Sequence, residues 1–174
     1  TMAIIIVLLY LNFRTISEVA MIIVTLPVAT IGGFWLMYLE GFNFSVAVGV
    51  GFIALAGVAV EIGVIMLVYL NQSITDLKQQ ALRNNTSISI EDYRQALMHG
   101  AGLRVRPVMM TVATIIIGLL PILYGDGTGS EVMSRIAAPM VGGMLSAVLL
   151  SLIALPALYL LVKYPQIQAH NKSV

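Results

Sequence analysis

Cysteine is absent from the 174-residue sequence, and only 10% of its residues are charged. Without cysteine the chain can form no disulfide and no thiolate metal site, so methionine is its only sulfur ligand. Nine basic residues stand against eight acidic ones, and they are scattered along the chain, which argues against a nucleic-acid partner. With 59% hydrophobic residues and a mean hydropathy of +0.97, a soluble domain is excluded, and the sequence indicates a protein of the lipid bilayer.

Motifs for hydrolytic chemistry are missing as well. The sequence contains no GxxxxGK[ST] nucleotide-binding loop, no nucleophile elbow and no His-based zinc motif. We therefore expect neither an enzyme nor a resident cofactor.

Long apolar runs are what the sequence does contain, and they predict an all-α membrane protein with a bundle of about five transmembrane helices. The first run is too short to cross a bilayer, so we interpret it as the end of a truncated helix. The five predicted apolar segments are residues 1–12, 17–39, 45–70, 107–124 and 136–163. The three polar stretches are a linker with a short surface helix at residues 71–106, a loop at 125–135 and a tail at 164–174.

The surface helix of the linker has a recognisable beginning. Ser89 and Asp92 have the spacing of a capping box, and Gly100 is a plausible stop. His99, close to that stop, is interpreted as a surface or capping histidine rather than a metal ligand. The residues expected to face inward are Tyr93, Ala96 and Leu97.

The basic residues predict the orientation of the bundle. Eight of the nine fall on one side if the first run exits to the cytoplasm, and this excess is the usual signature of the cytoplasmic side. The linker and the tail are then cytoplasmic, residues 40–45 and 125–135 are periplasmic, and Arg135 is the one basic residue outside. The eight inner residues are Arg14, Lys78, Arg83, Arg94, Arg104, Arg106, Lys163 and Lys172.

One ionisable residue, Glu61, interrupts the apolar run Val46 to Leu70. In a helix it lies ~22 Å from the start of the run and ~13 Å from its end, inside the hydrocarbon layer. Acids at such depth are costly and usually take part in ion or proton movement, because desolvation disfavours the charged form of a carboxyl. The alternative is a permanently protonated carboxyl that hydrogen-bonds a neighbouring helix.

The residues on the same helical stripe as Glu61 are mostly small, and small residues let another helix approach closely. We therefore expect Glu61 to point at protein rather than lipid. We call this set the Glu61 stripe: Ala47, Val50, Ala54, Gly57 and Glu61.

Four stretches of the sequence carry a family resemblance: GFIALAGVAVEIGVIM, HGAGLRVRP, TVATIIIGLLPI and GSEVMSRIAAPMVGGM. They resemble the C-terminal membrane helices of the heavy-metal efflux branch of the resistance-nodulation-division transporters, from the end of the eighth transmembrane helix through the twelfth. The resemblance covers nearly the whole chain. It implies the second-half membrane domain of a homotrimeric bacterial inner-membrane pump that works with a periplasmic adaptor and an outer-membrane channel.

The resemblance also implies roles for two residues. A Glu at the position of Glu61 is similar to the proton relay of the exporters of monovalent copper and silver. Met133, within SEVMSR, aligns with a methionine implied in handing the metal ion along. A thioether is a soft donor that suits Cu(I) or Ag(I) and is poor for Zn(II). The transported ion is therefore expected to be Cu(I) or Ag(I), driven out by proton antiport.

One position departs from the copper and silver pattern, because Val108 stands where those exporters carry a Lys directly after RVRP. Two other functions stay open: export of divalent metals such as Co, Zn or Cd on the same fold, and a membrane bundle that packs but transports nothing. Methionines in the apolar runs are interpreted as flexible core residues rather than ligands. They are Met66, Met109, Met110, Met140 and Met144.

Overall fold

A computed structural model describes residues 2–84 and 89–171 of the chain. Every regular element in these two ranges is a helix, which confirms the all-α prediction. Four of the helices are long and apolar enough to cross a membrane, and the first is a short apolar helix. The helices are α1 (Met2–Phe13), α2 (Ile16–Leu39), α3 (Val46–Asn84), α4 (Ile90–Tyr124) and α5 (Ser130–Asn171).

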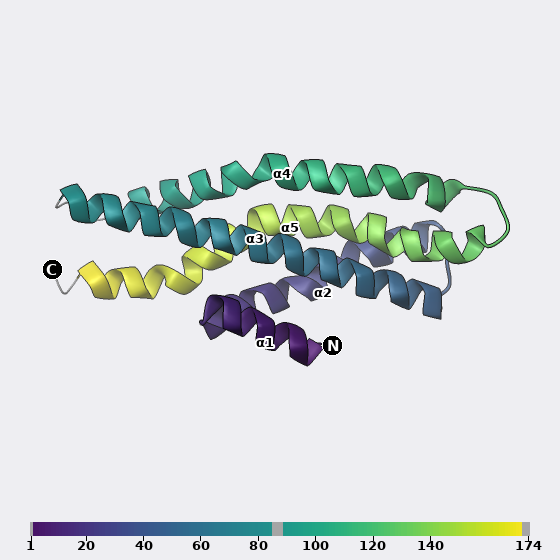
Figure 1. Ribbon diagram of the computed structural model, residues 1–174, viewed down its shortest axis with the longest axis horizontal. Helices are drawn as coiled ribbons and strands as arrows, with labels where there is room; N and C mark the ends of the chain where they lie inside the picture. The colour runs from purple at the N-terminus through teal and green to yellow at the C-terminus, as the bar shows by residue number, and fades with distance from the viewer. Residues whose placement is uncertain (1, 85–88, 172–174) are drawn as a thin grey trace.

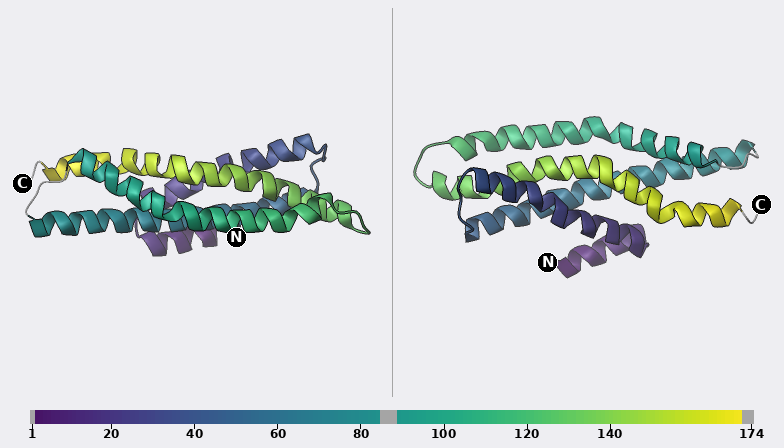
Figure 2. Two further views of the ribbon diagram at one scale, coloured as in Figure 1. Left: turned by 90° about the horizontal axis from the view of Figure 1, so that it is seen from above. Right: turned by 180° about the vertical axis from the view of Figure 1, so that it is seen from behind.

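Helix α5 lies at the centre of the bundle and contacts α2, α3 and α4, whereas α1 contacts α2 at the margin (Figure 1, Figure 2). Glycines explain how close these helices come. A methyl group on Gly32 of α2 would overlap the carbonyl oxygen of Gly142 of α5, and one on Gly51 of α3 would overlap that of Ile136 of α5. Only glycine permits such backbone contact, which holds helices together where no hydrophobic force drives them out of lipid.

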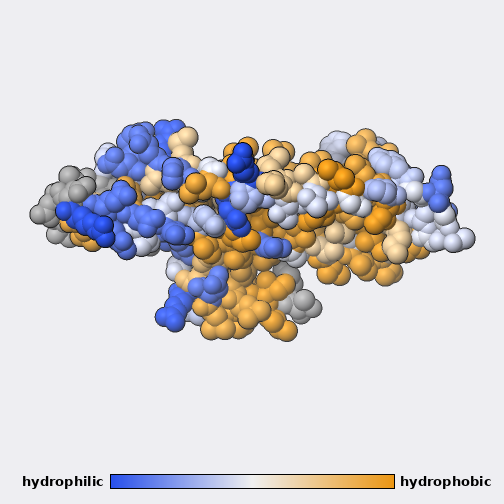
Figure 3. Space-filling view, turned by 45° about the horizontal axis from the view of Figure 1, so that its top comes forward, coloured by the Kyte–Doolittle hydropathy of each residue, from blue (hydrophilic) through white to orange (hydrophobic). Residues whose placement is uncertain are grey.

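The ends of α3, α4 and α5 gather at two ends of the bundle (Figure 1). We call the end where α3 finishes, α4 begins and α5 finishes the basic end, because most of the basic residues lie toward it. The opposite end carries the α2–α3 and α4–α5 connections and is called the glycine-rich end, after Gly125, Gly127 and Gly129. Figure 3 shows the largest group of hydrophilic side chains toward the basic end, a mostly apolar surface over the middle of the bundle, and further hydrophilic side chains at the opposite end.

The polar linker differs from the prediction in one respect. The capping box is present, because Ser89 N donates to an Asp92 carboxylate oxygen at 3.0 Å and Ser89 Oγ accepts from Glu91 N at 3.4 Å. The expected stop at Gly100 is wrong, because α4 continues through Gly100 and Pro107 to Tyr124. A methyl group on Gly100 would overlap Ser73 Oγ of α3, so this glycine serves helix packing rather than helix termination.

Two helices are also longer than the apolar runs that predicted them. Helix α3 continues about four turns beyond Leu70 to Asn84, so residues 71–84 of the linker are helical. Helix α5 begins at Ser130, which places residues 130–135 of the predicted loop in its first turns. Hydropathy marks the part of a helix that lipid surrounds, and a helix can continue past that part when its next turns pack on a neighbour.

Candidate functional site

Glu61 lies in the middle of the apolar part of α3, and its side chain is exposed in this chain. Val50 and Gly57, one to three turns away on the Glu61 stripe, are exposed too, and a methyl group on Gly57 would meet no atom within 4 Å. The expectation that Glu61 points at protein is therefore not met by the helices of this chain. Much of the Glu61 stripe is therefore not covered by another helix in the described ranges.

The reason is that a different face of α3 carries the larger side chains. Its buried residues recur every three or four positions, from Val48 through Leu55 and Ile62 to Ile74, and they face α5 and α4. Glu61 lies six residues after Leu55, about 120° around the helix axis from it. The larger side chains of that face make more van der Waals contacts with neighbouring helices than alanine and glycine would, and such packing holds helices together in lipid, so the Glu61 stripe is left outside.

Glu61 makes no hydrogen bond or ion pair with any side chain in the described ranges. Val108 is buried in an apolar cluster with Leu55, Ile62, Val112 and Met144. A lysine at position 108 would thus enter the cluster that contains Ile62, the neighbour of Glu61 in the sequence. Valine supplies no charge there, so this chain leaves Glu61 without a cation from α4 at that depth.

Arg104 is one helical turn from Val108 toward the basic end, and sequence reasoning had counted it only as a topology signal. Its guanidinium carbon lies 4.7 Å from the centre of the Tyr69 ring of α3, a cation–π distance. Its Nε is buried and has no hydrogen-bond partner within the described part of the chain. Arg104 is therefore held against α3 with unused hydrogen-bonding capacity.

Met133 lies in the first turns of α5 and is exposed, with its N–H donating to Gly129 O at 3.3 Å. It is therefore at the glycine-rich end, as its motif suggested. Helices α3 and α5 run parallel, and the contact of Gly51 with Ile136 sets their register. Met133 is consequently about 20 Å from Glu61 along the bundle, so the two predicted site residues are not brought together.

The other methionines fall into two groups. Met66 and Met144 are fully buried and Met140 packs against the same apolar cluster as Met144, as expected for core residues. Met109 and Met110 are exposed on α4, so within this chain they are not core residues. The described residues contain no group of three His, Asp or Glu side chains that could hold a metal ion.

A second polar site, which the sequence analysis did not identify, lies where the apolar parts of α2, α3 and α5 approach the basic end. Glu18 of α2 is 3% exposed, and its Oε1 accepts a hydrogen bond from Lys163 Nζ of α5 at 2.8 Å. Its Oε2 accepts from Asn71 Nδ2 of α3 at 3.0 Å. Tyr159 OH of α5 donates to Asn71 Oδ1. We call Glu18, Asn71, Tyr159 and Lys163 the Glu18 cluster.

Every polar side-chain group at the centre of this cluster has a partner. Glu18 is in the first turn of α2, where the helix dipole also favours a negative charge. Lys163 lies 5.0 Å from the Tyr159 ring centre and 3.5 Å from Asn71 Oδ1. Tyr93 of α4 belongs to the same buried cluster of side chains, and burial, followed by the nearby Tyr159, raises the pKa of Tyr93 above its ordinary value. Its phenol is therefore neutral beside the ion pair.

One signal in the sequence could have revealed the Glu18 cluster. Glu18, Asn71 and Lys163 each stand at the boundary of an apolar run, and the predicted topology places all three boundaries on the same side of the membrane. Polar residues at the same depth in three helices can contact one another only if the rotation of each helix turns them toward a common point.

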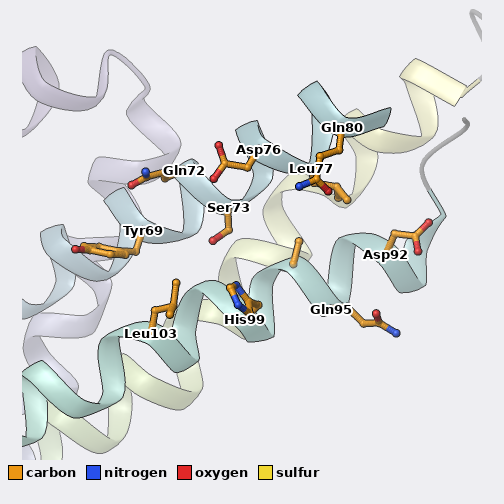
Figure 4. A pocket seen from close by; sticks show the side chains of 11 residues that line it. Tyr69, Gln72, Ser73, Asp76, Leu77, Gln80, Asp92, Gln95, His99 and Leu103 are labelled. Atoms are coloured by element: carbon orange, nitrogen blue, oxygen red, sulfur yellow. The ribbon is translucent and has the colours of Figure 1, made fainter. Parts of the chain in front are cut away.

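A groove of about 590 Å³, lined by both polar and apolar residues, lies between α3 and α4 near the basic end (Figure 4). Asp76 of α3 and Asp92 and His99 of α4 are among the residues that line it, and His99 is exposed on its surface. His99 lies inside α4 rather than at a helix end, so it caps nothing, although its place on the surface agrees with the prediction. These three side chains do not form a group that could hold a metal ion.

The sequence profile of the AcrB/AcrD/AcrF family matches residues 1–163. The chain belongs to this family. The "Putative cation efflux system protein SilA" of Salmonella typhimurium is 55% identical over 174 residues, which are 100% of this chain and 16% of SilA. The "Cation efflux system protein CusA" of Escherichia coli K12 is 57% identical over 162 residues, covering 93% of this chain and 15% of CusA.

A crystal structure of a heavy metal efflux pump superposes on the chain with a TM-score of 0.77 and 36% identity, over 93% of this chain and 15% of that pump. The resemblance to heavy-metal efflux transporters of this family is thereby confirmed, and the chain is part of a multi-pass membrane protein. It spans about one sixth of the length of the curated relatives that it matches.

Proposed function

We infer that the chain works as part of a bacterial inner-membrane pump that exports Cu(I) or Ag(I) in exchange for protons. The observation that carries this proposal is Glu61, an acid at mid-membrane depth that is exposed on a stripe of small residues and has no partner among the described side chains. Helices of the complete pump that are not in this chain would cover the Glu61 stripe. A carboxyl between two helices can change its protonation state as they move.

The choice of metal is supported by residues rather than by a bound ion. Met133 is an exposed thioether at the glycine-rich end, where the predicted topology places the periplasm. Soft sulfur ligands favour monovalent copper and silver over zinc. The relatives SilA and CusA, at 55% and 57% identity, are named as cation efflux proteins. Like other members of the resembled branch, the pump would be a homotrimer that passes its cargo to an adaptor and an outer-membrane channel.

Glu61→Gln in the complete pump tests the proton step. Gln keeps the shape and most hydrogen bonds of a protonated Glu but cannot titrate, so we expect the variant to assemble normally and to lose metal-linked proton flux. The measurement uses proteoliposomes with an imposed proton gradient and a pH-sensitive dye inside. Glu40→Gln is the matched control, because Glu40 is a half-buried acid at the glycine-rich end that accepts one hydrogen bond from Tyr124.

The same vesicles separate the competing functions. Proton flux in Glu61→Gln equal to that of the unaltered pump would mean that Glu61 only forms hydrogen bonds between helices. The proposed proton relay would then fail. Flux in response to Zn(II), Co(II) or Cd(II) but not Cu(I) or Ag(I) would assign the pump to divalent metals. If none of these ions produces proton flux, the result would favour the third function, a membrane bundle that packs but transports nothing.

A further inference from the structure

We propose that the Glu18 cluster is a positioning site that fastens α2, α3 and α5 to one another at the basic end, so that the three helices move as one body during transport. This role rests on the transport function proposed above. Glu18 and Lys163 are 145 positions apart in the sequence, and Asn71 lies between them on a third helix. The helices α2 and α3 thus contribute one polar side chain each, and α5 contributes two, Tyr159 and Lys163, to a single set of hydrogen bonds.

The geometry argues that these hydrogen bonds hold the helices in one fixed arrangement. Both carboxylate oxygens of Glu18 have a partner, and the Asn71 amide donates on one side while it accepts on the other. Near the membrane interior a polar group that loses its partner has no water to replace it. Sliding or rotation of any one helix would therefore leave polar groups of the other two helices without hydrogen-bond partners. The cluster resists such motion for this reason.

A second point of attachment lies nearer the glycine-rich end and joins the same helices. Gly32 of α2 contacts Gly142 of α5 through the backbone, and Ser146 Oγ of α5 donates to Ala29 O of α2 at 2.5 Å. Gly51 of α3 is in backbone contact with Ile136 of α5. Two attachments at separate depths prevent both translation and tilting, which one attachment would not.

Helix α4 also packs against these helices, but by contacts of other kinds. Tyr93 packs beside Tyr159, and Arg104 lies on the ring of Tyr69. A methyl group on Gly100 would overlap Ser73 Oγ of α3. The Glu18 ion pair and the hydrogen bond from Asn71 join α2, α3 and α5, and these are the helices that the cluster fastens.

The test uses a cross-link to replace the ion pair in the complete pump, in a background without other reactive cysteines. Glu18→Cys with Lys163→Cys removes both charges, and we expect metal transport per folded trimer to fall at least tenfold. A short bifunctional thiol reagent that joins the two cysteines should restore transport to within about twofold of the unaltered pump. Glu40→Cys with Tyr124→Cys is the matched control, because it removes an exposed hydrogen bond at the other end, and we expect unchanged transport with and without the reagent.

The outcomes distinguish fastening from other roles. If the cross-link fails to restore transport, the pair acts through its charge or by carrying protons, and the positioning role is overturned. If the uncross-linked double variant only lowers the thermal midpoint while each folded trimer transports normally, the pair is merely stabilising, and the proposal is overturned as well.

A second measurement does not depend on transport. Spin labels at Ile16→Cys and Leu161→Cys, both exposed residues near the basic end of α2 and α5, report the distance between the two helices. We expect one narrow distance distribution in the unaltered cluster and a clearly broader one after Lys163→Met. An equally narrow distribution in both would overturn the proposal. If the pump moves no metal at all but Lys163→Met broadens the distribution, the transport function fails while the fastening stands.

Discussion

Two acids in one apolar bundle have opposite surroundings. Glu18 is 3% exposed and both of its carboxylate oxygens accept hydrogen bonds from other helices. Glu61 is exposed on a strip of small residues and has no side-chain partner in the described ranges. A carboxylate whose two oxygens accept hydrogen bonds from a cation and an amide on two other helices is held in place. An acid without fixed partners has no such restraint, and it is the one to which the function proposed above gives the proton step.

The comparison teaches that membrane depth alone does not assign a role to an acid. Glu61 was found from its depth in an apolar run, and Glu18 was overlooked because it stands at the edge of one. The structure reverses part of the expected order, since the acid at the edge is the buried one. In the roles proposed above, the partners of each acid, rather than its depth, separate the acid that positions helices from the acid that carries protons.

The largest effect is expected where helices are in backbone contact. Gly142→Leu should lower the yield of folded pump about tenfold or more, because any side chain there overlaps Gly32 O and Leu36. Gly57→Leu on the Glu61 stripe should retain most of the folded yield, because Gly57 has open space in this chain, but it should block transport if another helix approaches there. Size-exclusion chromatography of fluorescently tagged protein measures both yields. Equal losses of folded protein would contradict the difference between the two faces.

A smaller effect is expected from giving Glu61 a partner. Val108→Lys places a long cationic side chain in the cluster that contains Ile62, the residue after Glu61 in α3. A nearby positive charge favours an ionised carboxyl, so the acid limb of the pH profile of transport should move to lower pH by about one unit. Val108→Met is the control for side-chain size. If the acid limb of the pH profile is the same in the lysine variant as in the unaltered pump, a charge at position 108 has no electrostatic effect on Glu61.

The smallest effect is expected at Met133, which is exposed and contributes little to packing. Met133→Ile removes the sulfur at similar size, so cells should lose Cu or Ag resistance a few-fold at unchanged protein level. Met144→Ile is the control, because Met144 is fully buried and a volume-conserving swap there costs less than about 1.5 kcal/mol of stability without changing metal transport per folded protein. If the two variants reduce resistance equally after correction for protein level, Met133 has only a packing role.

The helices themselves were predictable, because apolar runs long enough to cross a bilayer leave few alternatives to a helix. The run at residues 17–39 differs from α2 (Ile16–Leu39) by one residue at its start. The capping box at Ser89 was likewise readable, since it depends on residues three positions apart. Gly100 was misinterpreted because a glycine that ends a helix and a glycine that admits a neighbouring helix look the same in sequence.

The sequence by itself determined that this is an all-α membrane protein with an acid at mid-depth and a thioether near one end, because hydropathy and spacing are local properties. Only the tertiary structure decided which way each side chain faces. The rotation of α3 exposes Glu61, and the packing of α2, α3 and α5 brings together Glu18, Asn71 and Lys163. Helix rotation is set by the fit of large and small side chains on several helices at once, and no single stretch of sequence contains that fit.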